Sequence, residues 1–210
     1  MYLANNDGTL EGTGWVVTKL YDGVYQRYYI DPTAHAAIPG YSSLGWAHYT
    51  RPEGYVLLNG KYIMNKKAYT ANNDGKLSYS STAASSITSA VNALANTPAE
   101  LDSKWVLNAL VSAGVREAVN ISAYAFEMYN NYCTSTSTSA LKVGMIVAVP
   151  TSSASNTSKT YGVVGIYLGN NNVMQFDGSK ATKMTLSSWK STYGKNATPK
   201  WGWFAGVELA

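Results

Sequence analysis

The chain has 210 residues, of which 46% are hydrophobic, which is enough for one medium domain or two small ones with their own cores. Charged residues make up only 13%, against roughly 25% in ordinary soluble domains, whereas tyrosine alone contributes 17 residues. Arg27, Arg51 and Arg116 are the arginines, so the clustered Arg and Lys of a nucleic-acid-binding protein are missing. No apolar run approaches the ~18 residues of a transmembrane helix. The composition therefore predicts neither a nucleic-acid partner nor a membrane span.

A single cysteine, Cys133, argues against an internal disulfide and a cysteine-rich metal site. It lies in a segment that reads as a loop, and we expect an incidental, partly buried thiol rather than a reactive one. Met1 is followed at once by the structured-looking run 2–10, which leaves no room for a signal peptide. We therefore expect a trimmed fragment or a protein exported by another route.

A nine-residue repeat lies near the N-terminus. Residues 2–10 (Tyr-Leu-Ala-Asn-Asn-Asp-Gly-Thr-Leu) recur as residues 69–77 (Tyr-Thr-Ala-Asn-Asn-Asp-Gly-Lys-Leu). In both copies Asn-Asp-Gly predicts a tight turn, because glycine accepts positive φ and Asn and Asp tolerate it. Further turns are predicted at residues 22–23 and 59–60, between short Tyr- and Val-rich runs. Residues 1–80 therefore predict a domain of small β-hairpins.

This segment holds eleven of the 17 tyrosines, two tryptophans and no phenylalanine. A Tyr or Trp ring offers an apolar face to the C–H face of a sugar, while its O–H or N–H can hydrogen-bond to the sugar. The alternative is that the rings build the core of hairpins poor in Leu and Ile. We select four candidate ligand-binding rings: Trp15, Tyr29, Trp46 and Tyr55. Three further polar residues we expect on the surface or in turns rather than in a metal site: Asp31, His35 and His48.

Short aromatic motifs recur across the same segment: a tyrosine pair, Tyr28-Tyr29, and three aromatic residues that follow a glycine, in Gly14-Trp15, Gly45-Trp46 and Gly54-Tyr55. Together with the flanking Tyr…Asn-Asp-Gly units, they resemble the cell-wall-binding repeats of Gram-positive surface proteins. The resemblance implies a domain that binds peptidoglycan or another cell-wall glycan. It also implies an extracellular or cell-wall-associated protein of bacterial or phage origin.

After Leu77 the pattern changes to helices and then to strands. Three helices are predicted from caps and apolar periodicity: one capped by Ser81 or Thr82 and ended by Thr97-Pro98, one with Asp102 as its N-cap and a left-handed Gly114 at its end, and one over about 122–129. Five strands are predicted: 145–149, 163–168, 173–176, 182–186 and 201–207. Residues 81–210 therefore predict an α+β domain with helices packed on an antiparallel sheet.

Four local motifs support a second resemblance. Residues 101–106 (Leu-Asp-Ser-Lys-Trp-Val) are followed by Ala-Gly-Val at 113–115, by Leu-Lys-Val-Gly-Met-Ile-Val at 141–147, and by Tyr-Gly-Val-Val-Gly-Ile-Tyr-Leu-Gly-Asn at 161–170. They are similar to Asp-Cys-Ser-Gly-Phe-Val, Ala-Gly-Ile, Leu-Lys-Pro-Gly-Asp-Leu-Val and Gly-His-Val-Gly-Ile-Tyr-Ile-Gly-Asn of the NlpC-type, papain-like peptidases, which cut peptidoglycan stem peptides. The resemblance spans residues 82–210 and implies a papain-like fold.

The resemblance also implies a catalytic Cys at a helix N-terminus, a His on the facing strand and a polar residue that orients the His. At these positions the chain has Asp102, Val163 and Gln175. Shifting the alignment by one residue puts Ser103 at the nucleophile position, but both histidines lie in the first 48 residues. A larger shift, to the helix near residues 121–122, supplies no thiol either. The resemblance therefore implies a degenerate domain without an intact triad.

Carboxylates offer a different hydrolytic chemistry, because glycoside cleavage uses two acids about 5 to 10 Å apart. The second half offers five candidates: Glu100, Asp102, Glu117, Glu127 and Asp177. As an N-cap, however, Asp102 would only stabilise its helix by about 1 kcal/mol. The polar stretch 151–160 we expect to be a mobile loop beside the former cleft.

The sequence thus favours a cell-wall-binding protein with an aromatic β-hairpin domain at 1–80 and a non-catalytic NlpC-type domain at 81–210. We expect no cofactor and no metal. The alternatives are an active peptidoglycan hydrolase with a non-standard site, and a surface or phage structural module that binds another protein. The favoured hypothesis requires a groove between Asp102, Val163 and Gln175, and aromatic rings that face solvent in a row.

Overall fold

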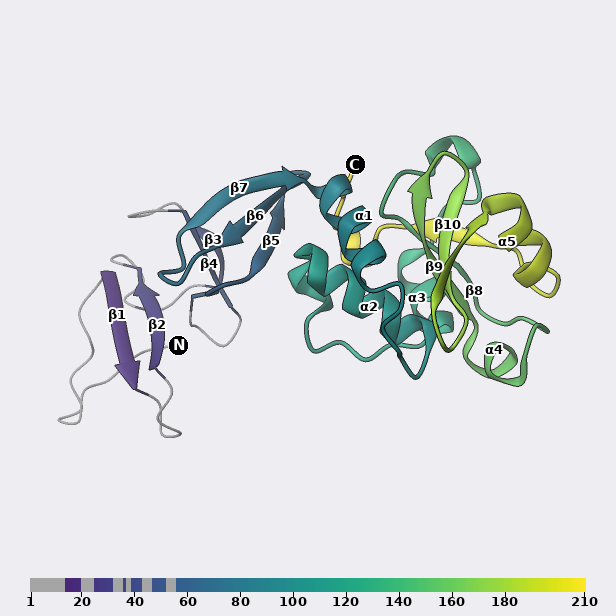
Figure 1. Cartoon of the computed structure of the whole chain (residues 1–210), viewed down its shortest axis with the longest axis horizontal. Coiled ribbons are helices and arrows are strands. Elements are labelled where there is room, and N and C mark those ends of the chain that lie inside the picture. The colour runs from purple at the N-terminus through teal and green to yellow at the C-terminus, as the bar shows by residue number, and fades with distance from the viewer. Residues whose placement is uncertain (1–13, 20–24, 32–35, 37–38, 43–46, 52–55) are drawn as a thin grey trace. The chain divides into compact units, whose positions relative to one another are not determined.

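The computed structural model describes residues 14–19, 25–31, 36, 39–42, 47–51 and 56–210. The chain divides into two compact units. The first unit comprises residues 1–62 and 69–80, and the second comprises residues 63–68 and 81–210. The first unit holds small strands, and the second holds helices around a sheet (Figure 1).

The first unit is built from antiparallel hairpins, which confirms the prediction for the residues described. Its paired strands are β1 (Gly14–Lys19) with β2 (Tyr25–Ile30), and β3 (Gly40–Ser42) with β4 (His48–Thr50). A sheet of three strands follows: β5 (Lys61–Met64), β6 (Lys67–Ala71) and β7 (Leu77–Thr82). Between β6 and β7, the Asn72 side chain accepts hydrogen bonds from the N–H groups of Asp74 and Lys76, at 3.0 and 2.9 Å. The second repeat copy therefore forms its predicted turn, whereas residues 2–10 and 22–23 lie outside the described part of the chain.

The tip of the β5–β6 hairpin belongs to the second unit. Asn65 and Lys66 both have positive φ, as a two-residue hairpin turn requires. The Ile63 N–H donates to the Gly114 carbonyl at 3.0 Å, and the Lys66 carbonyl accepts from the Ala83 N–H at 2.9 Å. These bonds fix the hairpin tip to the first helices of the second unit.

The second unit is α+β, as predicted. Its antiparallel sheet has the order β11-β10-β9-β8-β12. The strands are β8 (Ile146–Val149), β9 (Val163–Gly169), β10 (Asn172–Phe176), β11 (Ala181–Thr185) and β12 (Lys200–Gly202). The helices are α1 (Ala83–Ala93), α2 (Asp102–Ala113), α3 (Ala125–Tyr132), α4 (Asn156–Tyr161) and α5 (Leu186–Tyr193). None of the helices described is long and apolar enough to cross a bilayer.

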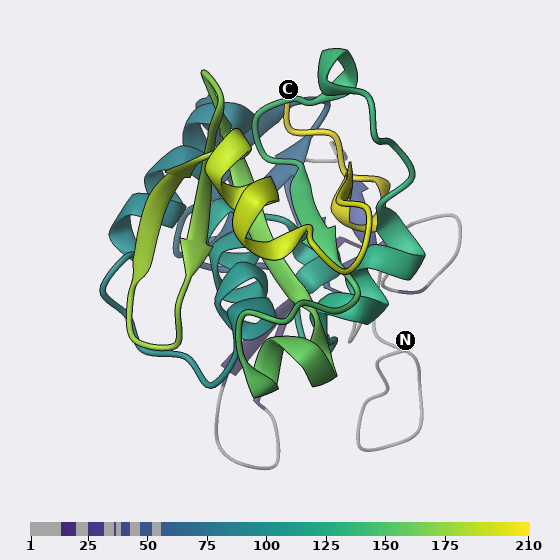
Figure 2. The same cartoon turned by 90° about the vertical axis from the view of Figure 1, so that its right-hand side faces the viewer.

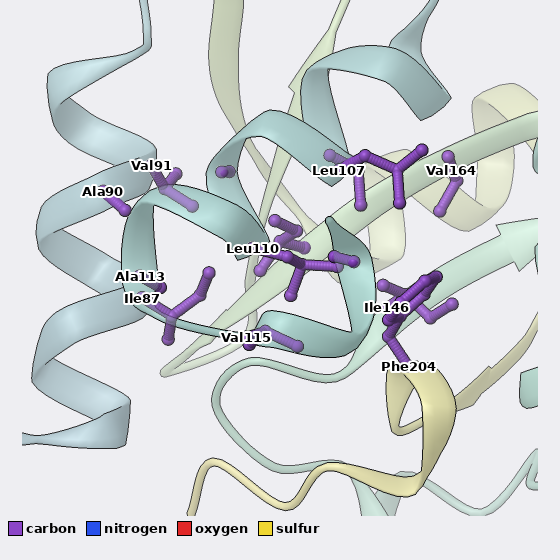
Figure 3. Close-up of a cluster of buried hydrophobic side chains, with 14 of the residues drawn as sticks. Ile87, Ala90, Val91, Leu107, Leu110, Ala113, Val115, Ile146, Val164 and Phe204 are labelled. Atoms are coloured by element: carbon purple, nitrogen blue, oxygen red, sulfur yellow. The ribbon is translucent and has the colours of Figure 1, made fainter. Parts of the chain in front are cut away.

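Side chains alternate between two cores, one on each face of the sheet. Ile146 and Val164 point toward α1, α2 and α3, where Leu107 and Leu110 of α2 meet them (Figure 3). Their neighbours in sequence, such as Val147, pack on the opposite face with Leu186 and Trp189 of α5. Figure 2 shows α5 in front of the sheet, with α1 and α2 behind it. The sheet is therefore covered on both faces, with α2 and α5 on opposite sides of it.

Local signals placed the start of the first helix and the end of the second correctly, whereas the first helix ends at Ala93, before the predicted stop at Thr97-Pro98. The Thr82 hydroxyl accepts from the Ser85 N–H at 3.1 Å and caps α1, and α2 ends at Gly114 with φ of 110°. The third helix begins later than predicted, at Ala125. The Glu127 carboxylate sets this start by accepting from the Tyr124 N–H at 2.7 Å.

Two other expectations are wrong. Residues 151–160 are not a loop throughout, because α4 begins at Asn156 with the Ser155 hydroxyl accepting from the Ser158 N–H at 3.0 Å. The predicted strand 201–207 is only the short β12, because a 3₁₀ turn with positive φ at Ala205 follows it. A hydroxyl cap in the first segment and turn geometry in the second override the patterns from which we predicted them.

Candidate functional site

Asp102 begins α2 and ties that helix to two strands of the sheet. Its Oδ1 accepts from the Ser103 N–H at 2.7 Å, and its Oδ2 accepts from the Val164 N–H on β9 at 2.9 Å. A longer bond of 3.4 Å joins Oδ2 to the side-chain amide of Gln175 on β10. The N-cap position belongs to Leu101, so the prediction that Asp102 is the N-cap is wrong.

Gln175 links this carboxylate to the helix on the other face of the sheet. Its side chain is buried, and its Nε2 also donates to the Phe176 carbonyl at 2.9 Å. Its Oε1 accepts from the Trp189 indole N–H on α5 at 2.7 Å. The Gln175 amide is therefore satisfied within the protein and holds Asp102 and α5 in a fixed relation.

Val163 starts β9 and lies in the core on the α5 side of the sheet. Its aliphatic side chain can neither accept nor donate a proton. Gly162 precedes it with φ of 80°, and a Cβ there would lie 2.5 Å from the Val149 carbonyl oxygen. A glycine is therefore required where the chain passes close to the Val149 carbonyl just before β9 begins.

A pocket of about 390 Å³ lies where these three residues meet. Asp102, Val163 and Gln175 all line it, together with residues of α4, residues 177–178 and Tyr193 of α5. Ser103, the alternative nucleophile position, is buried and is not among the lining residues. The structure thus brings together the three positions selected from the sequence, and α4 lies beside them.

The pKa values of two carboxylates at this pocket, Asp102 and Asp177, are shifted in opposite directions. Asp102 is partly buried, and the resulting desolvation of its carboxylate raises its pKa from 3.8 to about 6, although hydrogen bonds such as those from Val164 and Ser103 oppose the shift. Asp177 is exposed, and hydrogen bonds from the Lys180 N–H and from Ser179 lower its pKa. Burial raises the pKa of Tyr193, and the charges of Asp102 and Asp177 raise it further.

The remaining acids separate into two groups. Glu100 lines the pocket with Asp102 and Asp177, whereas Glu117 and Glu127 do not. Glu127 instead stabilises the start of α3. The pocket therefore contains three of the five carboxylates considered from the sequence.

Cys133 is remote from this chemistry. Its thiol is buried at the end of α3, 4.0 Å from the Ile146 carbonyl oxygen, and burial raises its pKa to about 12. Such a thiol stays protonated near neutral pH, which confirms the expectation of an incidental, unreactive cysteine.

In the first unit, two of the four selected rings form a cluster with His48. The ring centroids of Trp15 and Tyr29 lie 5.0 Å apart, and the His48 ring lies 4.9 Å from Trp15 and 4.8 Å from Tyr29. His48 is buried, so the expectation that it is a surface or turn residue is wrong. Trp46, Tyr55 and His35 lie outside the described residues.

Five other tyrosines form a continuous row of rings, which we call the tyrosine row. The row runs Tyr49, Tyr62, Tyr41, Tyr69, Tyr79, with successive ring centroids 4.3, 6.2, 6.4 and 6.4 Å apart. Its most accessible rings are Tyr79 (59% exposed) and Tyr41 (37% exposed). The sequence analysis did not select these rings. The register of the β5–β6–β7 hairpins, which puts Tyr62, Tyr69 and Tyr79 on adjacent strands, is the signal that could have found them.

No family model matches this chain, and no curated protein matches it.

Proposed function

We propose that this protein binds peptidoglycan or another bacterial cell-wall glycan, and that its second unit is a catalytically degenerate NlpC-type domain. The observation that carries the proposal is the tyrosine row. Neighbouring rings of the row contact one another, two of them, Tyr41 and Tyr79, are exposed to solvent, and each ring carries a hydroxyl. A polysaccharide presents the complementary surface, with C–H faces for the rings and hydroxyls for the phenol groups.

The resemblance of residues 1–80 to cell-wall-binding repeats supplies the class of glycan. It also supplies the location of the protein, outside the cell or on the wall. The low content of charged residues, 13%, fits a binding surface that uses stacking and neutral hydrogen bonds.

The pocket geometry supports the degenerate character of the second unit. Asp102 occupies the position that the resemblance assigns to the nucleophile, and both of its oxygens accept hydrogen bonds from the protein. Val163 occupies the position of the base. A thiol or hydroxyl nucleophile needs a neighbouring base to activate it, and this pair supplies neither the thiol nor the base. The pocket can therefore bind a ligand without cleaving it.

A second candidate function has one observation in its favour. Asp102 and Asp177 line the same pocket with pKa values displaced in opposite directions, which is the pattern of an acid and a base in a glycosidase. The hydrogen bonds to Asp102 weaken this candidate, because a general acid must direct its proton toward the ligand.

The test is co-sedimentation of the purified chain with insoluble peptidoglycan, combined with analysis of the supernatant for new reducing ends and new amino groups. We expect the protein in the pellet and no released product. Release that is abolished by Asp102→Ala would establish the hydrolase instead. Absence of the protein from the pellet with any bacterial wall would refute the binding function and favour a structural module.

A further inference from the structure

A stack of three aromatic rings borders the pocket of the second unit. Tyr161, the last residue of α4, lines the pocket, and its ring stacks on Tyr124 with centroids 4.6 Å apart and 21° between the planes. Tyr124 in turn stacks on Phe126 at 5.9 Å and 14°. Tyr124 is 41% exposed, so it forms part of a surface rather than of the core. Tyr124 thus packs against one face of the Tyr161 ring, and Tyr161 also contributes to the pocket wall.

Polar groups from separate elements surround the same space. Glu100 precedes α2, Thr157 lies on α4, Asp177 follows β10, and Tyr193 ends α5. All three hydrogen bonds to Asp177 go to Oδ1, which leaves its Oδ2 to accept from a ligand. These side chains can hydrogen-bond to several hydroxyl groups at once.

The charge of the lining selects among ligands. Three carboxylates line the pocket, and no Lys or Arg is among its lining residues. An anionic ligand would meet like charges in the lining, where the cation that acts on these carboxylates is Lys180, beside Asp177 and outside the lining. A peptidoglycan stem peptide carries carboxylates, so the lining disfavours the ligand that the resemblance would suggest. A neutral molecule rich in hydroxyls suits it better.

We propose that this pocket binds a neutral saccharide, with one sugar ring stacked on Tyr161 and with sugar hydroxyls donating to Glu100 and Asp177. At about 390 Å³ the pocket lies at the lower end of the range for small-molecule sites, about 300 to 1,000 Å³, and so suits a short saccharide rather than an extended chain. This site is separate from the tyrosine row. It rests on the proposed function only in that the pocket does not cleave what it binds.

The test uses the full chain with the double substitution Tyr41→Ala and Tyr79→Ala, which removes the most accessible rings of the tyrosine row. The probe is the N-acetylglucosamine trimer, titrated by calorimetry. We expect one binding site. Adding Tyr124→Ala should weaken it by about threefold and adding Tyr161→Ala by about tenfold, whereas Tyr161→Phe should stay within about twofold, because the phenyl ring still stacks. Asp177→Asn should also weaken binding by a few-fold.

Ile121→Ala is the matched control, because Ile121 is 39% exposed in the same segment as Tyr124 but does not line the pocket. It should leave the affinity unchanged. Tyr161→Ala changes a residue of α4 and could disturb that helix. Tyr124→Ala tests the same ring stack without changing α4, because Tyr124 lies outside that helix. An oligosaccharide of the same length that contains glucuronic acid should bind at least tenfold more weakly than the neutral probe.

The outcomes separate the two proposals. Saccharide binding by the wild type that is lost in the tyrosine-row double variant would overturn the pocket site and leave the proposed function intact. Binding of the probe by the double variant, with unchanged sedimentation of that variant on peptidoglycan, would support the pocket and remove the tyrosine row from the function. A stem tripeptide that binds more tightly than the trimer, or an affinity unaffected by both Tyr124→Ala and Tyr161→Ala, would overturn the saccharide assignment.

Discussion

The Asp102 carboxylate accepts a hydrogen bond of 2.9 Å from the backbone N–H of Val164, 62 residues further along the chain. This bond joins the first residue of α2 to β9, and it fixes the carboxylate at the edge of the pocket. The arrangement satisfies the strand N–H with a group that is itself costly to desolvate. Asp102 thus links α2 to β9, and protonation of its carboxylate changes the contribution of this link to the stability of the fold.

The titration of Asp102 predicts that the protein becomes more stable as the pH falls through about 6. Its pKa is about 6 in the folded state and 3.8 in the unfolded chain, so the folded state binds the proton more tightly. The corresponding stability is fully present below pH 3.8 and is lost as the pH rises through about 6. It amounts to at most about 3 kcal/mol, reduced by the solvent that reaches the pocket.

The measurement is the free energy of unfolding in urea between pH 4 and about 7.5, for the wild type and for Asp102→Asn. The substitution keeps the side-chain shape and removes its titration. We expect the difference between the two proteins to change with pH around 6, which separates Asp102 from every other titrating group. Parallel profiles would show that the folded-state pKa of Asp102 is close to its ordinary value.

Gln175 should couple Asp102 and Trp189 energetically. Replacing it by Leu removes the acceptor of the Trp189 indole N–H and one donor to Asp102, and leaves buried polar atoms without these partners. We expect Gln175→Leu to lower the free energy of unfolding by about 2 to 4 kcal/mol. A double-mutant cycle with Trp189→Phe should give a coupling of about 1 kcal/mol, because the phenylalanine ring has no N–H to donate. Additive effects would contradict the link.

The tyrosine row predicts a loss of wall binding without a loss of stability. Tyr41→Ala with Tyr79→Ala removes its two most accessible rings, and we expect the affinity for insoluble peptidoglycan to fall about tenfold. The free energy of unfolding should change by less than about 1 kcal/mol, because both side chains are exposed. The pair Tyr41→Phe and Tyr79→Phe is the control, and it should keep the stacking and most of the affinity. Equal sedimentation of all three proteins would exclude the row from the binding surface.

A structural feature could be predicted from the sequence when the residues that form it are close together along the chain. The cap of the first helix, predicted at Ser81 or Thr82 and found at Thr82, and the left-handed Gly114 both involve neighbouring residues, and both lie where the sequence predicted them. The sequence also placed Asp102 at the start of a helix, but its bond to Val164 depends on how the helix packs on the sheet. Local signals therefore suggested a cap. The sequence did not predict the stacking of Tyr161 on Tyr124 either, because the two residues are far apart along the chain and meet only through the packing of the fold.

The aromatic surface of the first unit shows the same limit. Selecting rings from short aromatic motifs chose Trp15 and Tyr29, which pack with the buried His48. The tyrosine row instead arises from the pairing of strands, which places side chains from several strands side by side on one face of a sheet. Composition predicted that tyrosines would dominate this unit, but strand register decides which of them reach solvent.

Gly162 should tolerate substitution far less than Gly178, although both glycines line the pocket and both have positive φ. A Cβ at Gly162 would lie 2.5 Å from the Val149 carbonyl oxygen and 3.0 Å from the Phe126 nitrogen, whereas a Cβ at Gly178 would meet nothing within 4 Å. Gly178→Ala therefore adds backbone strain alone, about 1 kcal/mol, and Gly162→Ala adds a collision between strands, for a total of about 3 kcal/mol or more. Urea denaturation of the two variants measures the difference. Because backbone atoms cannot yield as a side chain can, equal costs at the two positions would mean that β8 and β9 are farther apart at Gly162 than the structure places them.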